Sequence, residues 1–192
     1  MNRTHLDYLA SDLWAERLRE DLVPWITEVA DLGDDVLEIG PGPGLTTDIV
    51  RARTTHVTAV EVDPALGAAL TERLAGTNVD VLVGDAAEVD LPAGRFTAAT
   101  CFSVLHHVPT VEHQDRLLER IRSLLRPGAA LFAVDSRDLE FIREAHEDDV
   151  FNPLAETTLV DRLRGAGFAE VDLEVGEYEL RFVARTADAI SG

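Results

Sequence analysis

The sequence predicts an α/β protein with a doubly wound, mainly parallel sheet that ends in an antiparallel hairpin. Two observations predict this fold class. Short apolar runs alternate with amphipathic helical stretches from residue 35 to residue 135, which is typical of β/α units in a parallel sheet. Near the end of the chain, residues 170–175 and 178–185 alternate polar and apolar positions around Gly176-Glu177, which indicates a hairpin.

The expected parallel strands lie in a core of residues 34–135. They are residues 35–39, 56–62, 80–83, 96–102 and 130–135. The helices expected between them begin at Leu45, Pro64 and Thr110, the last of which is also a good helix cap. Because right-handed crossovers place the carboxyl ends of parallel strands on one edge of the sheet, we expect a ligand site along that edge.

Three further segments complete one expected domain over residues 1–192, since no linker or internal repeat divides the chain. Residues 1–33 predict a helical cap with one apolar stripe, which contains Leu18, Leu22, Trp25 and Val29. Residues 136–158 predict an irregular insertion with a short helix, which we expect to form a lid or to bind substrate. Residues 159–186 predict a closing helix and the hairpin.

The charge balance limits the partners that we expect. Thirty-six acidic residues face seventeen basic ones, for a formal net charge of −19. Such a field repels nucleic-acid backbones and anionic lipid surfaces, so we expect a small-molecule partner and neither nucleic acid nor membrane. All basic residues are arginine, which excludes Schiff-base chemistry through lysine. One cysteine and no apolar N-terminal leader favour cytoplasmic residence. We expect a monomer or a homodimer.

A turn of sequence Gly-Pro-Gly-Pro-Gly at residues 40–44 follows the first expected strand. Glycine lets a backbone approach a ligand closely, and N–H groups at the start of the next helix point outward. Glu61 ends the second strand, 21 residues after Gly40, where a carboxylate accepts both hydroxyls of a ribose. Two prolines remove N–H donors, and Leu45 replaces the third glycine of the dinucleotide fingerprint. The turn therefore suits a sulfonium nucleoside with an amino-acid tail better than a diphosphate.

Five motifs in order resemble those of the class I S-adenosylmethionine-dependent methyltransferases, and most of all their small-molecule "type 11" branch. They are VLEIGPGPG, AVEVDP, VGDAAEVDLP, FTAATCFSVLHHVP and LLRPGAALFAVDSRD, over about residues 35–135. The terminal hairpin is also similar to the one that closes this Rossmann-like fold. The resemblance implies that S-adenosyl-L-methionine is the cofactor and S-adenosyl-L-homocysteine the product.

The resemblance also implies cofactor-binding roles for residues at or just after the ends of the first four strands. Residues expected at the methionine part are Glu38 with the turn of Gly40, Pro41, Gly42 and Gly44, and the Phe102 carbonyl. Residues expected at the nucleoside are Glu61 on the ribose diol, Val62 against the adenine, and Asp85 and Ala86 on the adenine nitrogens. Pro43 departs from the family, in which many members have threonine at this position, so any side-chain hydrogen bond from this position is lost.

The candidate catalytic residues are His106 and His107, which follow the fourth strand where the family binds its substrate. By analogy with relatives that place an acid or imidazole there, we expect His106 to face the substrate as a base and His107 to point inward. A structural role for His106 is an equal alternative, because many family members need only proximity.

No metal site is expected. His106, His107 and His113 are the histidines considered for one, but adjacent histidines rarely share an ion without strain, and no carboxylate-rich ligand spacing accompanies them.

Ser103, Asp135 and Arg137 are the candidate substrate-binding residues. Asp135 ends the fifth strand and either binds the acceptor or caps a helix. Arg137 and Arg143 in the insertion either clamp a carboxylate or solvate a lid helix. Tyr8 and Trp14 of the helical cap either close over the site or pack elsewhere.

The function that these residues predict is methyl transfer from S-adenosylmethionine to an oxygen, nitrogen or carbon atom of a small molecule. One alternative is a relative that binds the cofactor but transfers no methyl group. A weaker alternative is an RNA methyltransferase, against which stand the charge and the FSVLHH stretch, where exocyclic-amine enzymes of this fold typically have an Asn-Pro-Pro-Tyr-like turn. The weakest is a dinucleotide oxidoreductase.

Overall fold

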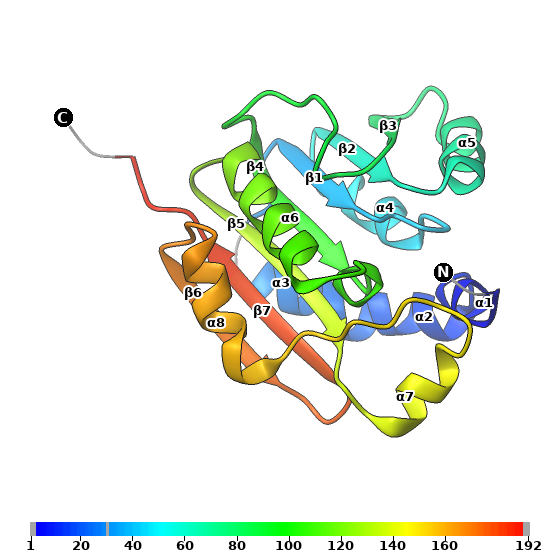
Figure 1. Ribbon diagram of the computed structural model, residues 1–192. Helices are drawn as coiled ribbons and strands as arrows, with labels where there is room; N and C mark the ends of the chain where they lie inside the picture. Colours follow the sequence, from blue (N-terminus) through cyan, green and yellow to red (C-terminus); the bar gives the residue numbers. More distant parts are fainter. Residues whose placement is uncertain (1–2, 30, 190–192) are drawn as a thin grey trace.

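The computed structural model describes residues 3–29 and 31–189 and contains a sheet of seven strands in the order β3-β2-β1-β4-β5-β7-β6. The strands are β1 (Asp35–Ile39), β2 (His56–Glu61), β3 (Val79–Val83), β4 (Phe96–Phe102), β5 (Leu125–Ser136), β6 (Glu170–Val175) and β7 (Glu179–Arg185). The first five are parallel, and β7 is antiparallel to both β5 and β6 (Figure 1). The predicted sheet and hairpin are therefore confirmed.

Helices cover both faces of the sheet and form two apolar layers. On one face lie α6 (Val111–Leu124) and α8 (Glu156–Gly165), whose Leu118 and Leu159 pack in the same layer as Leu131 of β5. On the other face lie α3 (Val23–Val29), α4 (Leu45–Val50) and α5 (Pro64–Arg73), whose layer includes Phe132 (Figure 1). Leu131 and Phe132 are adjacent in β5 and point to opposite faces, because side chains alternate along a strand.

The helical cap is divided into α1 (Arg3–Leu9), α2 (Asp12–Arg17), a π-helical turn over Leu18–Leu22, and α3. Pro24 explains the π-helical turn, because it lacks an N–H group, and the Val23 N–H bonds to the Leu18 carbonyl five residues back. The extra residue shifts the apolar stripe by one position. Ile26 is therefore buried where Trp25 was expected, and Trp25 is only partly buried.

β5 begins five residues earlier than expected, at Leu125 and not at Ala130. Leu125 already has an extended backbone directly after α6, so Pro127-Gly128 lies within the strand. The pairing with β4 absorbs these residues in an irregularity between Phe96 and Ala98.

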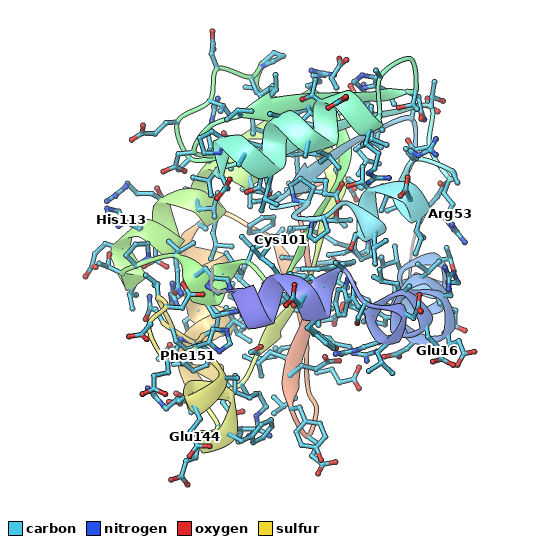
Figure 2. All side chains as sticks on the ribbon, turned by 90° about the vertical axis from the view of Figure 1, so that its right-hand side faces the viewer. Glu16, Arg53, Cys101, His113, Glu144 and Phe151 are labelled. Atoms are coloured by element: carbon cyan, nitrogen blue, oxygen red, sulfur yellow. The ribbon has the colours of Figure 1, made fainter. Side chains whose placement is uncertain are left out.

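The carboxyl ends of the parallel strands lie at one edge of the sheet, which two peripheral segments cover. These segments are α1–α2 and the insertion that contains α7 (Glu140–Ala145), and they lie on the same side of the molecule in Figure 1. Figure 2 views the molecule from this side, with Cys101 of β4 near the centre, α1 in front of it, and Glu144 and Phe151 of the insertion at the lower left. The fold thus places two segments outside the sheet over its ligand-binding edge.

Candidate functional site

The glycine turn between β1 and α4 adopts a backbone that needs its three glycines. Gly40, Gly42 and Gly44 have φ angles of +64°, +53° and +85°, a left-handed region that side chains disfavour. A Cβ atom on Gly40 would lie 2.5 Å from Cγ2 of Val104, which follows β4. The alternating prolines separate these residues, so the turn is both tightly bent and stiff.

Arg73 of α5 holds the far side of this turn, a contact that the sequence did not reveal. Its guanidinium donates to the carbonyls of Pro43 and Gly44 at 3.3 and 3.1 Å, and to the Asp48 carboxylate at 2.6 Å. Carbonyl groups that would otherwise face solvent are satisfied in this way, and the turn is linked to two helices.

Two buried glutamates lie beside the turn. Glu61 is 5% exposed, and its carboxylate accepts hydrogen bonds from the Gly42 N–H at 3.0 Å and the Asp63 N–H at 2.9 Å. Glu38 is 2% exposed, and its Oε2 atom has no hydrogen-bond partner among the residues that the structure describes. Burial, followed by repulsion from Asp48 and Glu61, raises the pKa of Glu38 to about 7, against the opposing influence of the Thr47 hydroxyl and Arg73. A buried acceptor that lacks a donor fits a ligand with a cationic or N–H group at this place.

A pocket of about 480 Å³ extends from the turn across the ends of β1, β2 and β3. Its lining includes Gly40, Val62, Asp85 and Ala86, four residues that the sequence predicted for the cofactor. The Asp85 carboxylate already accepts the Ala87 N–H at 2.8 Å and so orders the loop after β3. Phe102 is buried at the end of β4. The structure therefore brings the expected cofactor residues to one edge of the sheet.

His106 and His107 lie in a 3₁₀ turn, Leu105–His107, after β4. His106 is fully buried, and its Nδ1 lies 2.6 Å from Oδ1 of Asp135, whose Oδ2 accepts the Leu105 N–H at 2.8 Å. His107 is less buried and lines the 480 Å³ pocket. The two orientations are the reverse of those favoured from the sequence, because the buried Asp135 carboxylate holds His106 inside. Burial and then the neighbouring His106 lower the pKa of His107 to about 4.

A second pocket, of about 260 Å³, lies next to this turn between α1–α2, α7 and the ends of β4 and β5. Its polar lining includes Ser103 and Asp135, two of the residues that were candidates for substrate binding from the sequence. Its aromatic lining consists of Tyr8, Trp14, Phe141 and Tyr178. Ser103 has a φ of +57°, an uncommon backbone for a side-chain-bearing residue, and strain of this kind gathers at functional sites.

The arginines of the insertion lie elsewhere. Arg137 donates to the Gly176 carbonyl at 2.8 Å and pairs with Glu156 at 3.3 Å, outside the 260 Å³ pocket. Arg143 pairs with Asp138.

Phe141 and Tyr178, which line the 260 Å³ pocket, were not expected from the sequence. The insertion and the hairpin turn carry no motif that marks a lining residue.

No helix within residues 3–29 and 31–189 has both the length and the apolar character that crossing a membrane requires.

Comparison with known proteins agrees with this geometry. Residues 36–128 match a family model described as "Methyltransferase domain". A curated relative, "Probable ribosomal RNA small subunit methyltransferase A" of Methanothermobacter thermautotrophicus, is 54% identical over 142 residues, which cover 67% of this chain and 51% of that protein. The chain thus spans about half the length of this relative, and 37% and 36% of two further relatives of the same name.

Solved structures share the whole fold. The 1,6-didemethyltoxoflavin-N1-methyltransferase of Burkholderia thailandensis, solved with its substrate and S-adenosylhomocysteine, matches with a TM-score of 0.71 and 25% identity, over 95% of this chain and 86% of that one. The [4+2]-cyclase SpnF matches with a TM-score of 0.69 and 19% identity, over 88% and 80% of the two chains.

The order of the strands and the solved structures show the fold of the class I S-adenosylmethionine-dependent methyltransferases, and residues 36–128, just under half of this chain, match the methyltransferase-domain model. S-adenosylmethionine is the cofactor of the family, as the sequence predicted.

Proposed function

We propose that this chain transfers a methyl group from S-adenosylmethionine to a small acceptor with an aromatic or apolar body. The observation that carries this proposal is the 260 Å³ pocket, which lies at the ends of β4 and β5 and has aromatic walls. Pockets of this composition bind flat organic molecules and exclude water. The cofactor supplies an electrophilic methyl group, and the protein's task is to align an acceptor atom with it.

The cofactor residues keep the roles implied by their motifs. Residues proposed at the methionine part are Glu38, Gly40, Pro41, Gly42, Gly44 and Phe102, and those proposed at the nucleoside are Glu61, Val62, Asp85 and Ala86. The Glu38 Oε2 atom, which has no donor among the described residues, and the left-handed glycines support this assignment. Glu61 accepts hydrogen bonds from two backbone N–H groups, so its carboxylate is already oriented beside the turn. The remaining lone pairs of the carboxylate would accept hydrogen bonds from the two hydroxyls of a ribose.

Ser103 and Asp135 are the proposed acceptor-side residues, and His106 has a positioning role through Asp135. A general base must reach the proton that it removes, whereas His106 is fully buried. Its contact with Asp135 supports a different role, in which His106 aligns the pocket wall and does not act as a base. Transfer then depends on proximity and on exclusion of water by α1–α2 and α7. His107 belongs to the cofactor side of the same turn.

RNA is a second candidate acceptor, because the curated relatives bear names of ribosomal RNA methyltransferases. The charges near the pocket favour the small acceptor. Arg17 pairs with Glu179, Arg143 pairs with Asp138, and the chain as a whole carries −19. Arginines neutralised by carboxylates attract phosphate backbones weakly. A third candidate, cofactor binding without methyl transfer, is kept because the same fold occurs in a cyclase.

An acceptor screen with release of S-adenosylhomocysteine as the readout separates these candidates. The panel contains phenols, aromatic amines and nitrogen heterocycles, with small-subunit ribosomal RNA and isolated small subunits as the RNA arm. We expect release with a member of the small-molecule panel and no methyl incorporation into RNA. RNA methylation in preference to the panel would establish the second candidate, and cofactor binding without turnover in either arm would favour the third.

Phe141→Ala and Tyr178→Ala are expected to raise the KM of the active acceptor about tenfold each, or about 1.4 kcal/mol, while the Kd of S-adenosylmethionine changes little. The two rings contact each other edge to face at 5.8 Å on the pocket wall, so each truncation opens that wall. Val111→Ala, an exposed apolar residue outside both pockets, is the control. An unchanged acceptor KM in both ring variants would place the acceptor elsewhere.

A further inference from the structure

Three histidines meet beneath the sheet edge, although they come from two distant segments of the chain. His106 and His107 belong to the 3₁₀ turn after β4, and His146 directly follows α7. Each histidine has one ring nitrogen, Nδ1 or Nε2, that lies within 4.8 Å of one ring nitrogen of each of the other two. The ring centroids of His106 lie 4.1 Å from His107 and 5.0 Å from His146. His113, the partner considered from the sequence, is not part of this group and lies exposed on α6.

The Nδ1 atom of each histidine faces an oxygen atom. His106 Nδ1 lies 2.6 Å from the Asp135 carboxylate, His107 Nδ1 lies 3.1 Å from the Val150 carbonyl, and His146 Nδ1 lies 2.7 Å from the Ile142 carbonyl. A carbonyl or carboxylate oxygen can only accept, so each Nδ1 carries the proton. The proton on Nδ1 leaves the lone pair of a neutral imidazole on Nε2. All three rings are therefore held in the tautomer that coordinates a metal through Nε2.

Metal-bound histidines have this same arrangement, with the second ring nitrogen bonded to a carboxylate or a backbone carbonyl. Such contacts fix the ring and increase its basicity. Two carboxylates also lie close enough to offset a cation's charge: Asp135 on His106, and Asp149, whose Oδ2 is 3.8 Å from His107 Nδ1. Both are side chains with little exposure, at 0% and 7%.

We propose that His106, His107 and His146 bind one divalent transition-metal ion of the zinc type through their Nε2 atoms. Three neutral imidazoles suit Zn²⁺, Co²⁺ or Ni²⁺ and are poor ligands for Mg²⁺ or Ca²⁺. Tetrahedral coordination at about 2.1 Å separates ligand nitrogens by about 3.4 Å, so nitrogens that lie within 4.8 Å of one another need to close by at most about 1.4 Å. His107 is only partly buried and His146 lies at the C-terminal end of the short helix α7, so a shift of these two rings would supply this movement. The strain expected for adjacent histidines is relieved, because the 3₁₀ turn already brings the two rings side by side.

The ion would fasten the insertion to the sheet. His146 and Asp135 line the 260 Å³ pocket, and Phe151 of the insertion stacks on His146 with ring centroids 4.5 Å apart. Binding would therefore fix the α7 segment against the 3₁₀ turn after β4 and order one wall of the acceptor pocket. This metal site goes beyond the proposed methyl transfer, and its test does not depend on an acceptor.

Calorimetric titration of the full chain with ZnCl₂ in millimolar MgCl₂ tests the site. The Mg²⁺ occupies the acidic surface, which would otherwise bind Zn²⁺ without specificity. We expect one Zn²⁺ per chain, and a loss of affinity of at least about tenfold in His146→Ala and in His107→Ala. His113→Ala is the matched control and should bind as the unmodified chain does.

Titration with CoCl₂ followed by absorption spectroscopy provides a second readout on the unmodified chain, in case a variant misfolds. Coordination by nitrogen in a four-coordinate site should give strong visible bands, whereas Co²⁺ on surface carboxylates gives the weak spectrum of an octahedral ion. Absence of Zn²⁺ binding in Mg²⁺, an octahedral Co²⁺ spectrum, or equal affinity in folded His146→Ala and His113→Ala would each overturn the proposal.

Discussion

Gly40→Ala is expected to weaken the binding of S-adenosylhomocysteine by at least about a hundredfold, equivalent to about 2.7 kcal/mol. Gly40 has a φ of +64°, and an added Cβ would lie 2.5 Å from Cγ2 of Val104. Valine cannot turn away easily, because its branched side chain is stiff at χ1. The turn itself must therefore move, and the turn is the surface that approaches the cofactor.

The matched control is Gly94→Ala. Gly94 has nearly the same φ, +62°, but nothing lies within 4 Å of its added Cβ. This variant measures the backbone strain alone, about 1 kcal/mol of stability, and should bind the ligand normally. The double variant Gly40→Ala/Val104→Ala removes the clash and should recover part of the affinity. Calorimetry measures binding, and denaturant unfolding measures stability. Equal ligand affinity in Gly40→Ala and Gly94→Ala would contradict the role of the turn.

The sheet was predictable because its signals are local. β1, β4 and β6 have the expected bounds, 35–39, 96–102 and 170–175, since each is an apolar or alternating run between clear turn residues. The common edge at which the parallel strands end followed from crossover handedness. The start of β5 was misplaced, because Pro127-Gly128 is a strong stop signal for a helix and gives no sign that the chain is already extended before it.

The helical cap shows where periodicity fails. A single proline, Pro24, accompanies a change in the spacing of the backbone hydrogen bonds, which join residues five apart in place of four. The buried position moves from Trp25 to Ile26 as a result. The apolar spacing of 18, 22, 25 and 29 is sound for an unbroken α-helix. A π-helical turn adds one residue, and no apolar pattern reports it.

The candidate site also contains residues that could be predicted from the sequence and residues that could not. The cofactor residues lie in motifs at or just after the ends of strands, where topology alone brings them together. The contacts of Arg73, Phe141, Tyr178 and His146 depend on how α5, the insertion and the hairpin pack, and a long-range contact leaves no mark in a single sequence. The orientation of His106 was misjudged for the same reason, because Asp135, 29 residues later, holds it inside.

Glu38→Gln is expected to stabilise the ligand-free protein at pH 8 by about 3 kcal/mol and to weaken its binding of S-adenosylmethionine. The pKa of Glu38 is raised from 4.5 to about 7, chiefly by burial, so the folded state holds a proton that the unfolded state has lost. The stability that this group contributes is complete below pH 4.5 and is lost as the pH rises to about 7. A difference of about 2.5 pKa units corresponds to about 3 kcal/mol.

Glutamine resembles the protonated acid, so the two proteins should be equally stable near pH 4.5 and diverge as the pH rises to 7. The difference between their unfolding free energies cancels the titration of every other group. Glu119→Gln, an exposed carboxylate on α6, is the control and should give no such divergence. A Glu38→Gln difference that is independent of pH would show that the carboxyl is not buried as an acid.

The same titration links cofactor binding to pH. If Glu38 faces the methionine ammonium, its carboxylate form binds the cation and its protonated form does not, so affinity in the unmodified chain should rise as the pH passes 7. Glu38→Gln should lack this rise and bind at pH 8 about tenfold or more weakly, the loss of one hydrogen bond to a charged group. The wild-type residue thus makes the free protein less stable at the pH where it makes the bound state tighter. Calorimetry at pH 6 and pH 8 measures the affinity of both proteins for the cofactor. If the affinity changes with pH in the same way in both proteins, Glu38 does not belong to the cofactor site.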